Sequence, residues 1–178
     1  MELHSLALIE LGVILALFVA VWLLSLILRD ASIVDIFWGI AGAVAAWSAF
    51  LISGAESTQT ILLVAIVTLW GLRLALHIGI RNFGKGEDYR YRNFRRNSPI
   101  PFWIYSLFQV FLLQGVIMWL VSMPVIAAIH LDTPGGLTWL DYVGIALFIT
   151  GFLFEAIGDW QLLRFKNNPA NKGKVLDS

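Results

Sequence analysis

The stretch SLALIELGVILALFVAVWLLSLIL, residues 5–28, decides the class of fold. Glu10 is its only charged residue. As a helix, the stretch spans the hydrocarbon core of a bilayer, which is about 30 Å thick, and a helix satisfies its own backbone hydrogen bonds where water is absent. The stretch is longer than the core of a signal peptide and follows no basic leader, so it predicts a retained membrane helix. We expect Glu10, near the outer end of this helix, to reach water.

Four further apolar runs follow. The sequence therefore predicts an all-α fold, a polytopic integral membrane bundle of five transmembrane helices over residues 5–28, 33–53, 60–80, 102–130 and 138–163. The composition agrees, because 59% of the residues are hydrophobic, 13% are charged and the mean hydropathy is +0.81. No soluble insert separates the runs, so we expect residues 1–178 to form a single membrane domain. Without cysteine and with only three histidines, no metal site is expected.

The lysine and arginine residues predict the orientation. Apart from Arg73, they lie only at the ends of the first, third and fifth runs and in the segments that follow these runs. Because such residues favour cytoplasmic loops, the pattern predicts an outside N-terminus and a cytoplasmic C-terminus. The net charge is zero, so no overall field points to nucleic acid.

The segment GKGEDYRYRNFRRN, residues 84–97, concentrates cations and aromatic rings beside the membrane. Acidic lipid headgroups attract such cations at about 1 kcal/mol each, which is the preferred interpretation of Arg95 and Arg96. Nucleic acid is not expected as a partner, because the segment is short and contains an acidic pair. A phosphorylated small molecule is the third possibility, bound by Arg81, Arg90 and Arg92.

Charged residues also lie inside the apolar runs. Arg73 is deep in the third run, where a cation costs at least about 2.5 kcal/mol on insertion scales. Glu155 and Asp159 lie one turn apart on the fifth run, beside a seven-residue repeat of glycines that can pack against another helix. Two interpretations stay open. These groups line a polar cavity, or Arg73 snorkels or pairs with Glu155 to lock the bundle.

Polar residues of the second and fourth runs have simpler interpretations. Asp35 opens the second run and can serve either as a helix cap or as a functional carboxylate. Gln109 and Gln114 are expected to hydrogen-bond neighbouring helices. Pro124 is expected to kink or end the fourth helix.

A dinucleotide suits this set of residues. Its phosphates need arginines, which bind them with two hydrogen bonds each, and its ribose hydroxyls need carboxylate acceptors. Trp38, Tyr89 and Tyr91 offer aromatic faces for its rings. The sequence contains no GxGxxG pattern, so a Rossmann domain is not the carrier.

Three segments carry a resemblance to a known family: SIVDIFWG (32–39), LWGLRLALHIGIRNFGKGEDYRYRNFR (69–95) and GFLFEAIGDWQLLRFK (151–166), with GKVLDS (173–178) after them. With these segments the chain resembles the steroid 5-alpha-reductase-like superfamily, specifically its bacterial branch with a domain of unknown function. The resemblance covers most of the chain, from about residue 30 onward.

The resemblance implies an integral membrane protein, of the bacterial inner membrane, in which NADPH enters from the cytoplasmic side and reduces an activated carbon–carbon double bond of a lipid-like or steroid-like substrate. It implies an oxidoreductase of lipid metabolism, embedded among membrane lipids. Asp35 or Tyr91 is the expected proton donor. The expected cofactor-binding residues are Arg73, Arg81, Arg90, Arg92, Glu155, Asp159 and Lys166.

The family pattern continues beyond GKxLDxG into an R-H-P-N-Y-F-G-E segment and further helices, so we expect the domain to be incomplete at its C-terminus and its activity to depend on the missing part. One alternative is a membrane methyltransferase that uses S-adenosylmethionine, since those enzymes share a similar C-terminal motif. The other is a non-catalytic membrane scaffold in which the polar residues are assembly contacts. The substrate and the oligomeric state stay open.

Overall fold

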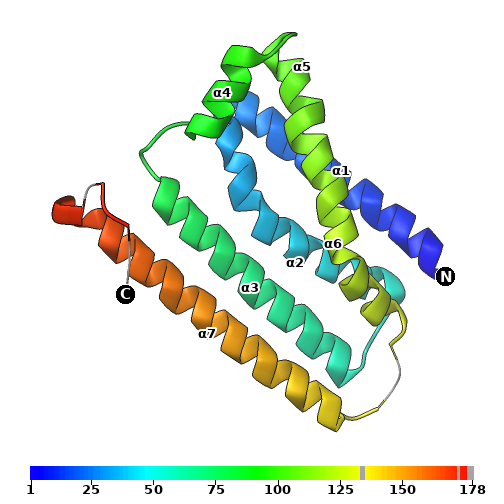
Figure 1. The fold of residues 1–178 in the computed structure, drawn as a ribbon. Coiled ribbons are helices and arrows are strands. Elements are labelled where there is room, and N and C mark those ends of the chain that lie inside the picture. The colour runs from blue at the N-terminus through cyan, green and yellow to red at the C-terminus, as the bar shows by residue number, and fades with distance from the viewer. Residues whose placement is uncertain (133–134, 172, 176–178) are drawn as a thin grey trace. The chain divides into compact units, whose positions relative to one another are not determined.

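The computed structural model describes residues 1–132, 135–171 and 173–175. Every regular element in these residues is a helix, which confirms the all-α prediction (Figure 1). The last part of the GKVLDS match, residues 176–178, lies outside the described residues. The elements, in chain order, are α1 (Leu3–Leu28), η1 (Ala31–Ile33), α2 (Val34–Ser53), α3 (Thr58–Asn82), α4 (Tyr89–Asn97), α5 (Phe102–Ser106), η2 (Leu107–Leu112), α6 (Leu113–His130), α7 (Trp139–Asn167) and η3 (Pro169–Asn171).

Five helical segments in the described residues are long and apolar enough to cross a membrane, which confirms the predicted number. They are α1, η1 with α2, α3, the continuous stretch Phe102–His130 and α7. The third and fifth extend a few residues beyond the predicted ends at residues 80 and 163. In addition, α4 forms within the basic segment 84–97, for which the sequence predicted no helix.

Side-chain caps explain where several helices begin. Ser57 accepts a hydrogen bond from the Thr60 amide at 3.1 Å and starts α3. Asp88 accepts from the Arg90 amide at 2.9 Å and starts α4. These oxygens satisfy backbone N–H groups that have no partner inside the first turn. The short α4 therefore owes its start to a carboxylate that precedes its first residue.

Residues 1–136 form one compact unit, in which α2 packs against α1, α3 and α6. The inner faces of α2 carry small residues, namely Gly39, Ala41, Gly42, Ala43, Ala45, Ala46 and Ala49. Gly39 and Gly71 touch backbone to backbone, because a Cβ added to either glycine would collide with the carbonyl group of the other. Small residues allow such close approach, and van der Waals packing then holds membrane helices together without a hydrophobic driving force.

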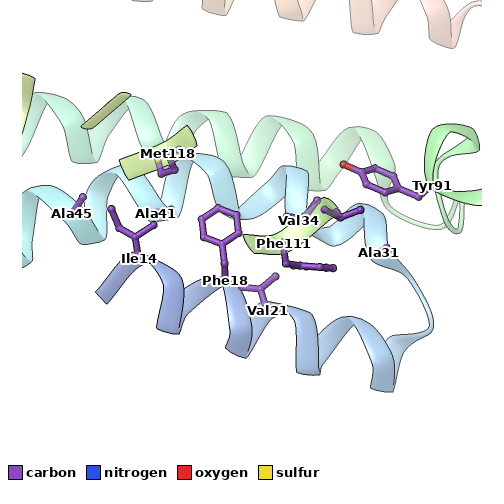
Figure 2. Close-up of a cluster of buried hydrophobic side chains, with 11 residues drawn as sticks. Ile14, Phe18, Val21, Ala31, Val34, Ala41, Ala45, Tyr91, Phe111 and Met118 are labelled. Atoms are coloured by element: carbon purple, nitrogen blue, oxygen red, sulfur yellow. The ribbon is translucent and has the colours of Figure 1, made fainter. Parts of the chain in front are cut away.

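Buried apolar side chains join α1, α2 and α6 in two clusters. The first contains Ile14, Phe18, Val21, Ala31, Val34, Ala41, Ala45, Tyr91, Val110, Phe111 and Met118 (Figure 2). Tyr91 brings α4 into this cluster, and its ring lies at the end beside Val34 and Ala31. The second cluster, around Leu6, Ala46, Val64 and Ile126, fills the opposite end of the unit.

The long helix from Phe102 to His130 is interrupted near its start. Its segment η2, Leu107–Leu112, is a π-helix, in which each turn holds an extra residue. The consecutive residues Val110 and Phe111 are both buried there. The helix does not end at Pro124, because α6 continues to His130.

Glu10 corrects the prediction that this residue reaches water. Its side chain is completely buried, and Ser48 on α2 donates a hydrogen bond to Oε2 at 2.6 Å. Within the described residues, the other carboxyl oxygen has no hydrogen-bond partner. The position of Glu10 near a helix end suggested exposure, but α2 covers it.

The second unit, residues 137–178, consists mainly of α7. Thr138 and Asp141 form a capping box at its start, where the Thr138 amide donates to Asp141 Oδ2 at 2.6 Å. At 100° per residue, Glu155, Asp159 and Lys166 share one face of this helix.

Candidate functional site

The segment before α4 is held against η1, the short helix that leads into α2, by two acidic residues. Glu87 Oε1 accepts from the Ala31 amide at 2.9 Å and from Arg95 Nη2 at 2.8 Å, and its other oxygen accepts from Arg95 Nε at 3.1 Å. The Asp88 amide donates to Ser32 Oγ at 3.3 Å. These bonds place α4 over the first turn of α2.

Asp35 receives two hydrogen bonds from α4. Tyr91 Oη donates to Oδ1 at 2.6 Å, and Arg90 Nη2 donates to Oδ2 at 2.8 Å. The Tyr91 residue is only 4% exposed, whereas the Arg90 side chain is 50% exposed and that of Asp35 is 17% exposed. The three groups therefore run from solvent into the interior of the first unit.

Gln114 extends this chain of hydrogen bonds inward. Its Oε1 accepts from Trp38 Nε1, and its side chain also hydrogen-bonds Tyr91. The single proton of the Tyr91 hydroxyl is donated to Asp35 Oδ1, so Gln114 is the donor to Tyr91 Oη, through its amide nitrogen. We call Trp38, Gln114, Tyr91, Asp35 and Arg90 the polar chain.

A carboxylate and a phenol at this end of the unit have shifted pKa values. Burial raises the pKa of Tyr91 well above its ordinary value, and the hydrogen bond and charge of Asp35 add to this effect, while Gln114 and Arg90 oppose it. Tyr91 therefore keeps its proton at any physiological pH. For Glu87, burial opposes ionisation, but the hydrogen bonds of Arg95 and Ala31 outweigh it and lower the pKa.

The structure brings Asp35, Tyr91 and Arg90 into contact, out of the nine residues predicted for the site. Arg92 lies on the same short helix and is exposed, and Arg81 Nε donates to the Asn82 side chain at 3.3 Å at the end of α3. Arg73 lies inside α3. The other three predicted residues, Glu155, Asp159 and Lys166, belong to the second unit, which is described by itself.

Sequence reasoning did not assign Gln114 and Glu87 to the site. Gln114 was expected to hydrogen-bond a neighbouring helix, which is confirmed by its contact with Trp38 on α2, but no sequence pattern linked it to Tyr91. Glu87 was visible only as half of an acidic pair. Its bidentate contact with Arg95 engages a guanidinium that had been interpreted as binding lipid headgroups.

The polar chain can hold a proton at a defined place in an otherwise apolar interior. A phenol with a raised pKa is a persistent hydrogen-bond donor, and a carboxylate beside it fixes the direction of the donated proton. The described residues contain no group of three or more His, Cys, Asp or Glu side chains that could hold a metal ion.

Comparison with known proteins gives one match. Residues 21–178 match the family described as "Protein of unknown function (DUF1295)", which is related to the steroid 5-alpha-reductase family. No curated protein and no solved structure matches the sequence. Because the matched residues cover most of the chain, this membrane protein belongs to the DUF1295 family.

Proposed function

We propose that this protein is an NADPH-dependent reductase of an activated carbon–carbon double bond in a lipid-like substrate. The observation that carries the proposal is the Asp35–Tyr91–Arg90 contact, with Tyr91 Oη 2.6 Å from Asp35 Oδ1. The relationship of the family to the steroid 5-alpha-reductase family supports it. The end of the unit that carries α4 faces the cytoplasm of a bacterial cell in this proposal, because the loop cations gather there.

The basic residues near α4 suit the phosphates of the cofactor. Arg92 is exposed, and Arg90 keeps half of its side chain exposed while paired with two carboxylates. Arginine has five N–H donors, so a guanidinium that binds a carboxylate can still bind a phosphate. Arg81, Arg90 and Arg92 would hold the phosphates, and Arg73 would line the rest of the site in the first unit. When bound, NADPH would supply the hydride that adds to the β carbon of the substrate.

Tyr91 is the proposed acid of the reaction. Addition of hydride to the β carbon of an enone moves an electron pair to the carbonyl oxygen, and the resulting enolate needs a proton or a hydrogen-bond donor. Rotation of the Tyr91 O–H bond turns the proton from Asp35 toward a substrate oxygen, while Gln114 still holds the phenol oxygen. Asp35 orients Tyr91 in the resting state, and its partly exposed carboxylate can take a proton from solvent and return it to the phenol oxygen after Tyr91 has donated.

Binding and turnover should respond to different variants. In lipid nanodiscs, NADPH binding is measured by calorimetry, and turnover by the loss of NADPH absorbance with a long-chain 2-enone. We expect Arg92→Gln to weaken binding about tenfold, the effect of one charge-assisted contact. Arg96→Gln removes the same charge from the same helix and is the matched control. Tyr91→Phe should keep the cofactor affinity and lose turnover.

Three results would contradict a cofactor site at the arginines of α4. If the folded wild-type protein does not bind NADPH, or if Arg92→Gln and Arg96→Gln weaken binding equally, the arginines of α4 are not a cofactor site. The polar chain would then be an assembly contact, as in the scaffold alternative. If S-adenosylmethionine binds instead and none of the loop arginines affects its affinity, the methyltransferase alternative replaces the reductase.

A further inference from the structure

A small cavity lies where α1 and α5 meet the end of α4. Its volume is about 70 Å³, and its lining includes Ser25, Arg29, Arg95, Phe102, Trp103 and Ser106. The membrane spans end at Leu28 and begin at Phe102 here, so the cavity lies at the boundary between hydrocarbon and headgroups. It is far smaller than the roughly 300–1,000 Å³ pockets that enclose drug-sized ligands, and so a whole dinucleotide cannot occupy it.

Arg29 enters this cavity from an unusual backbone position. It ends α1 in the left-handed conformation, with φ 55°, and is the only residue other than glycine with a positive φ among the described residues. Glycine is the usual residue at such a helix end, because a Cβ costs about 1 kcal/mol there. In the part of the chain that the structure describes, the Arg29 side chain forms no ion pair and no hydrogen bond. An arginine at a position that favours glycine, lining a cavity with a charge that no acid neutralises, indicates an anionic ligand.

Arg95 supplies a second guanidinium to the lining. Glu87 takes two of its N–H groups, through Nε and Nη2, and the guanidinium carbon lies 4.1 Å from the centre of the Phe102 ring. Of the five N–H donors of an arginine, three remain for another acceptor. Glu87 and the phenyl ring therefore hold Arg95 in place without using up its donors. Together, Arg29, Arg95 and Glu87 bring a net charge of +1 to the cavity and its immediate surroundings.

The rest of the lining suits a lipid. Trp22 Nε1 donates to the Trp103 carbonyl at 3.1 Å and fixes α1 to α5 on one side of the cavity. The hydroxyls of Ser25 and Ser106 donate to carbonyls of their own helices, so the two arginines are the main donors available to a ligand. Leu26 and Trp103, which also line the cavity, are 39% and 53% exposed. Their apolar surfaces continue from the cavity toward the region of the acyl chains.

From this geometry we propose that the cavity binds the phosphate group of an anionic phospholipid, with Arg29 and Arg95 as donors and the acyl chains along Leu26 and Trp103. Basic pockets between membrane helices at the headgroup level are known to recognise such lipids. The site is separate from the proposed cofactor site and does not depend on the reductase function.

The test compares two lipids and two variants. Purified protein in a mild detergent is titrated with phosphatidylglycerol or phosphatidylcholine, and bound lipid is counted by native mass spectrometry while the melting temperature is recorded. We expect phosphatidylglycerol to bind at least tenfold more tightly than phosphatidylcholine and to raise the melting temperature. Arg29→Gly should weaken phosphatidylglycerol binding about tenfold. The lipid-free melting temperature should be unchanged or higher, because glycine relieves the left-handed backbone.

Arg96→Gln is the matched control, because Arg96 is an exposed cation of α4 that does not line the cavity. An equal loss of affinity in Arg29→Gly and Arg96→Gln would show that the surface attracts acidic lipid without a site, and would overturn the proposal. Equal binding of the two lipids would do the same. If inorganic phosphate at millimolar concentration raises the melting temperature as much as phosphatidylglycerol does, the ligand is a free anion and the lipid assignment is wrong.

Discussion

The contact between Gly39 and Gly71 supports a sharp prediction about the bundle. A Cβ added to Gly39 would lie 2.9 Å from the Gly71 carbonyl carbon and 3.1 Å from its Cα, and closer still to its carbonyl oxygen. Ordinary carbon contacts begin at 3.4 Å, so α2 and α3 would have to separate by at least 0.5 Å at the carbon alone. Backbone atoms cannot move aside as side chains can.

The expected cost follows from the packing. Forcing one extra carbon into a tight interface costs about 1 to 3 kcal/mol, and the upper end applies here because both partners are backbone. Gly39→Ala should therefore destabilise the first unit by about 2 to 3 kcal/mol. Asp35 lies one turn before Gly39 on α2, so the displacement would also strain its contact with Tyr91.

The measurement is unfolding of the full chain in detergent, followed by circular dichroism. Gly42→Ala is the matched control. Gly42 is also buried on α2, but its added Cβ would meet only Trp70 at 4.0 Å, an ordinary contact. We expect this variant to be neutral or slightly stabilising, because alanine favours a helix interior over glycine by up to about 1 kcal/mol. If Gly39→Ala is as stable as Gly42→Ala, the two helices do not touch at the glycines and the reasoning fails.

Three further predictions concern single polar groups. Hydrogen bonds from the side chains of Ser57 and Thr60, the latter at 2.6 Å, and from the Glu56 and Ser57 amides lower the pKa of Asp132 to about 2 from an ordinary value of 3.8. The stability that the Asp132 carboxylate contributes is therefore present above about pH 4 and lost as the pH falls toward 2. Asp132→Asn should cost about 1 kcal/mol of folding stability at pH 7, after allowance for solvent screening. It should also reduce the loss of stability between pH 4 and 2 in acid unfolding. Glu10→Gln should cost less than about 1 kcal/mol in thermal unfolding, because an amide can still accept the hydrogen bond from Ser48. Glu10→Ala should cost about 2 to 4 kcal/mol, because it leaves a cavity at a completely buried position. Equal losses in the two variants would contradict this. Gln114→Met should cost about 2 kcal/mol of folding stability, because it leaves the Trp38 N–H without a hydrogen-bond partner. It should also shift the fluorine resonance of 3-fluorotyrosine at position 91, which is assigned by its absence in Tyr91→Phe. An unchanged resonance would show that Gln114 does not hydrogen-bond the phenol.

The candidate site was only partly accessible from sequence. Asp35, Arg90 and Tyr91 were selected because charged and aromatic residues are conspicuous beside apolar runs, and the structure joins them. Gln114 is one of many polar residues that could hydrogen-bond another helix, and its partner depends on how the helices pack. The π-helical segment η2, which has no marker residue such as proline, adds an extra residue per turn shortly before Gln114.

The sequence by itself determined the class of fold, the number of membrane helices and nearly all of their ends. The reason is that a bilayer imposes one length and one polarity on each span, so hydropathy alone is decisive. Only the tertiary structure decided which side chains meet. Glu10 is buried because α2 covers it, and α4 forms a helix over α2 because Asp88 caps it and Glu87 is tied to Ala31. Such contacts join residues far apart in the chain, and their geometry depends on close approaches such as that of Gly39 to Gly71, which no local pattern specifies.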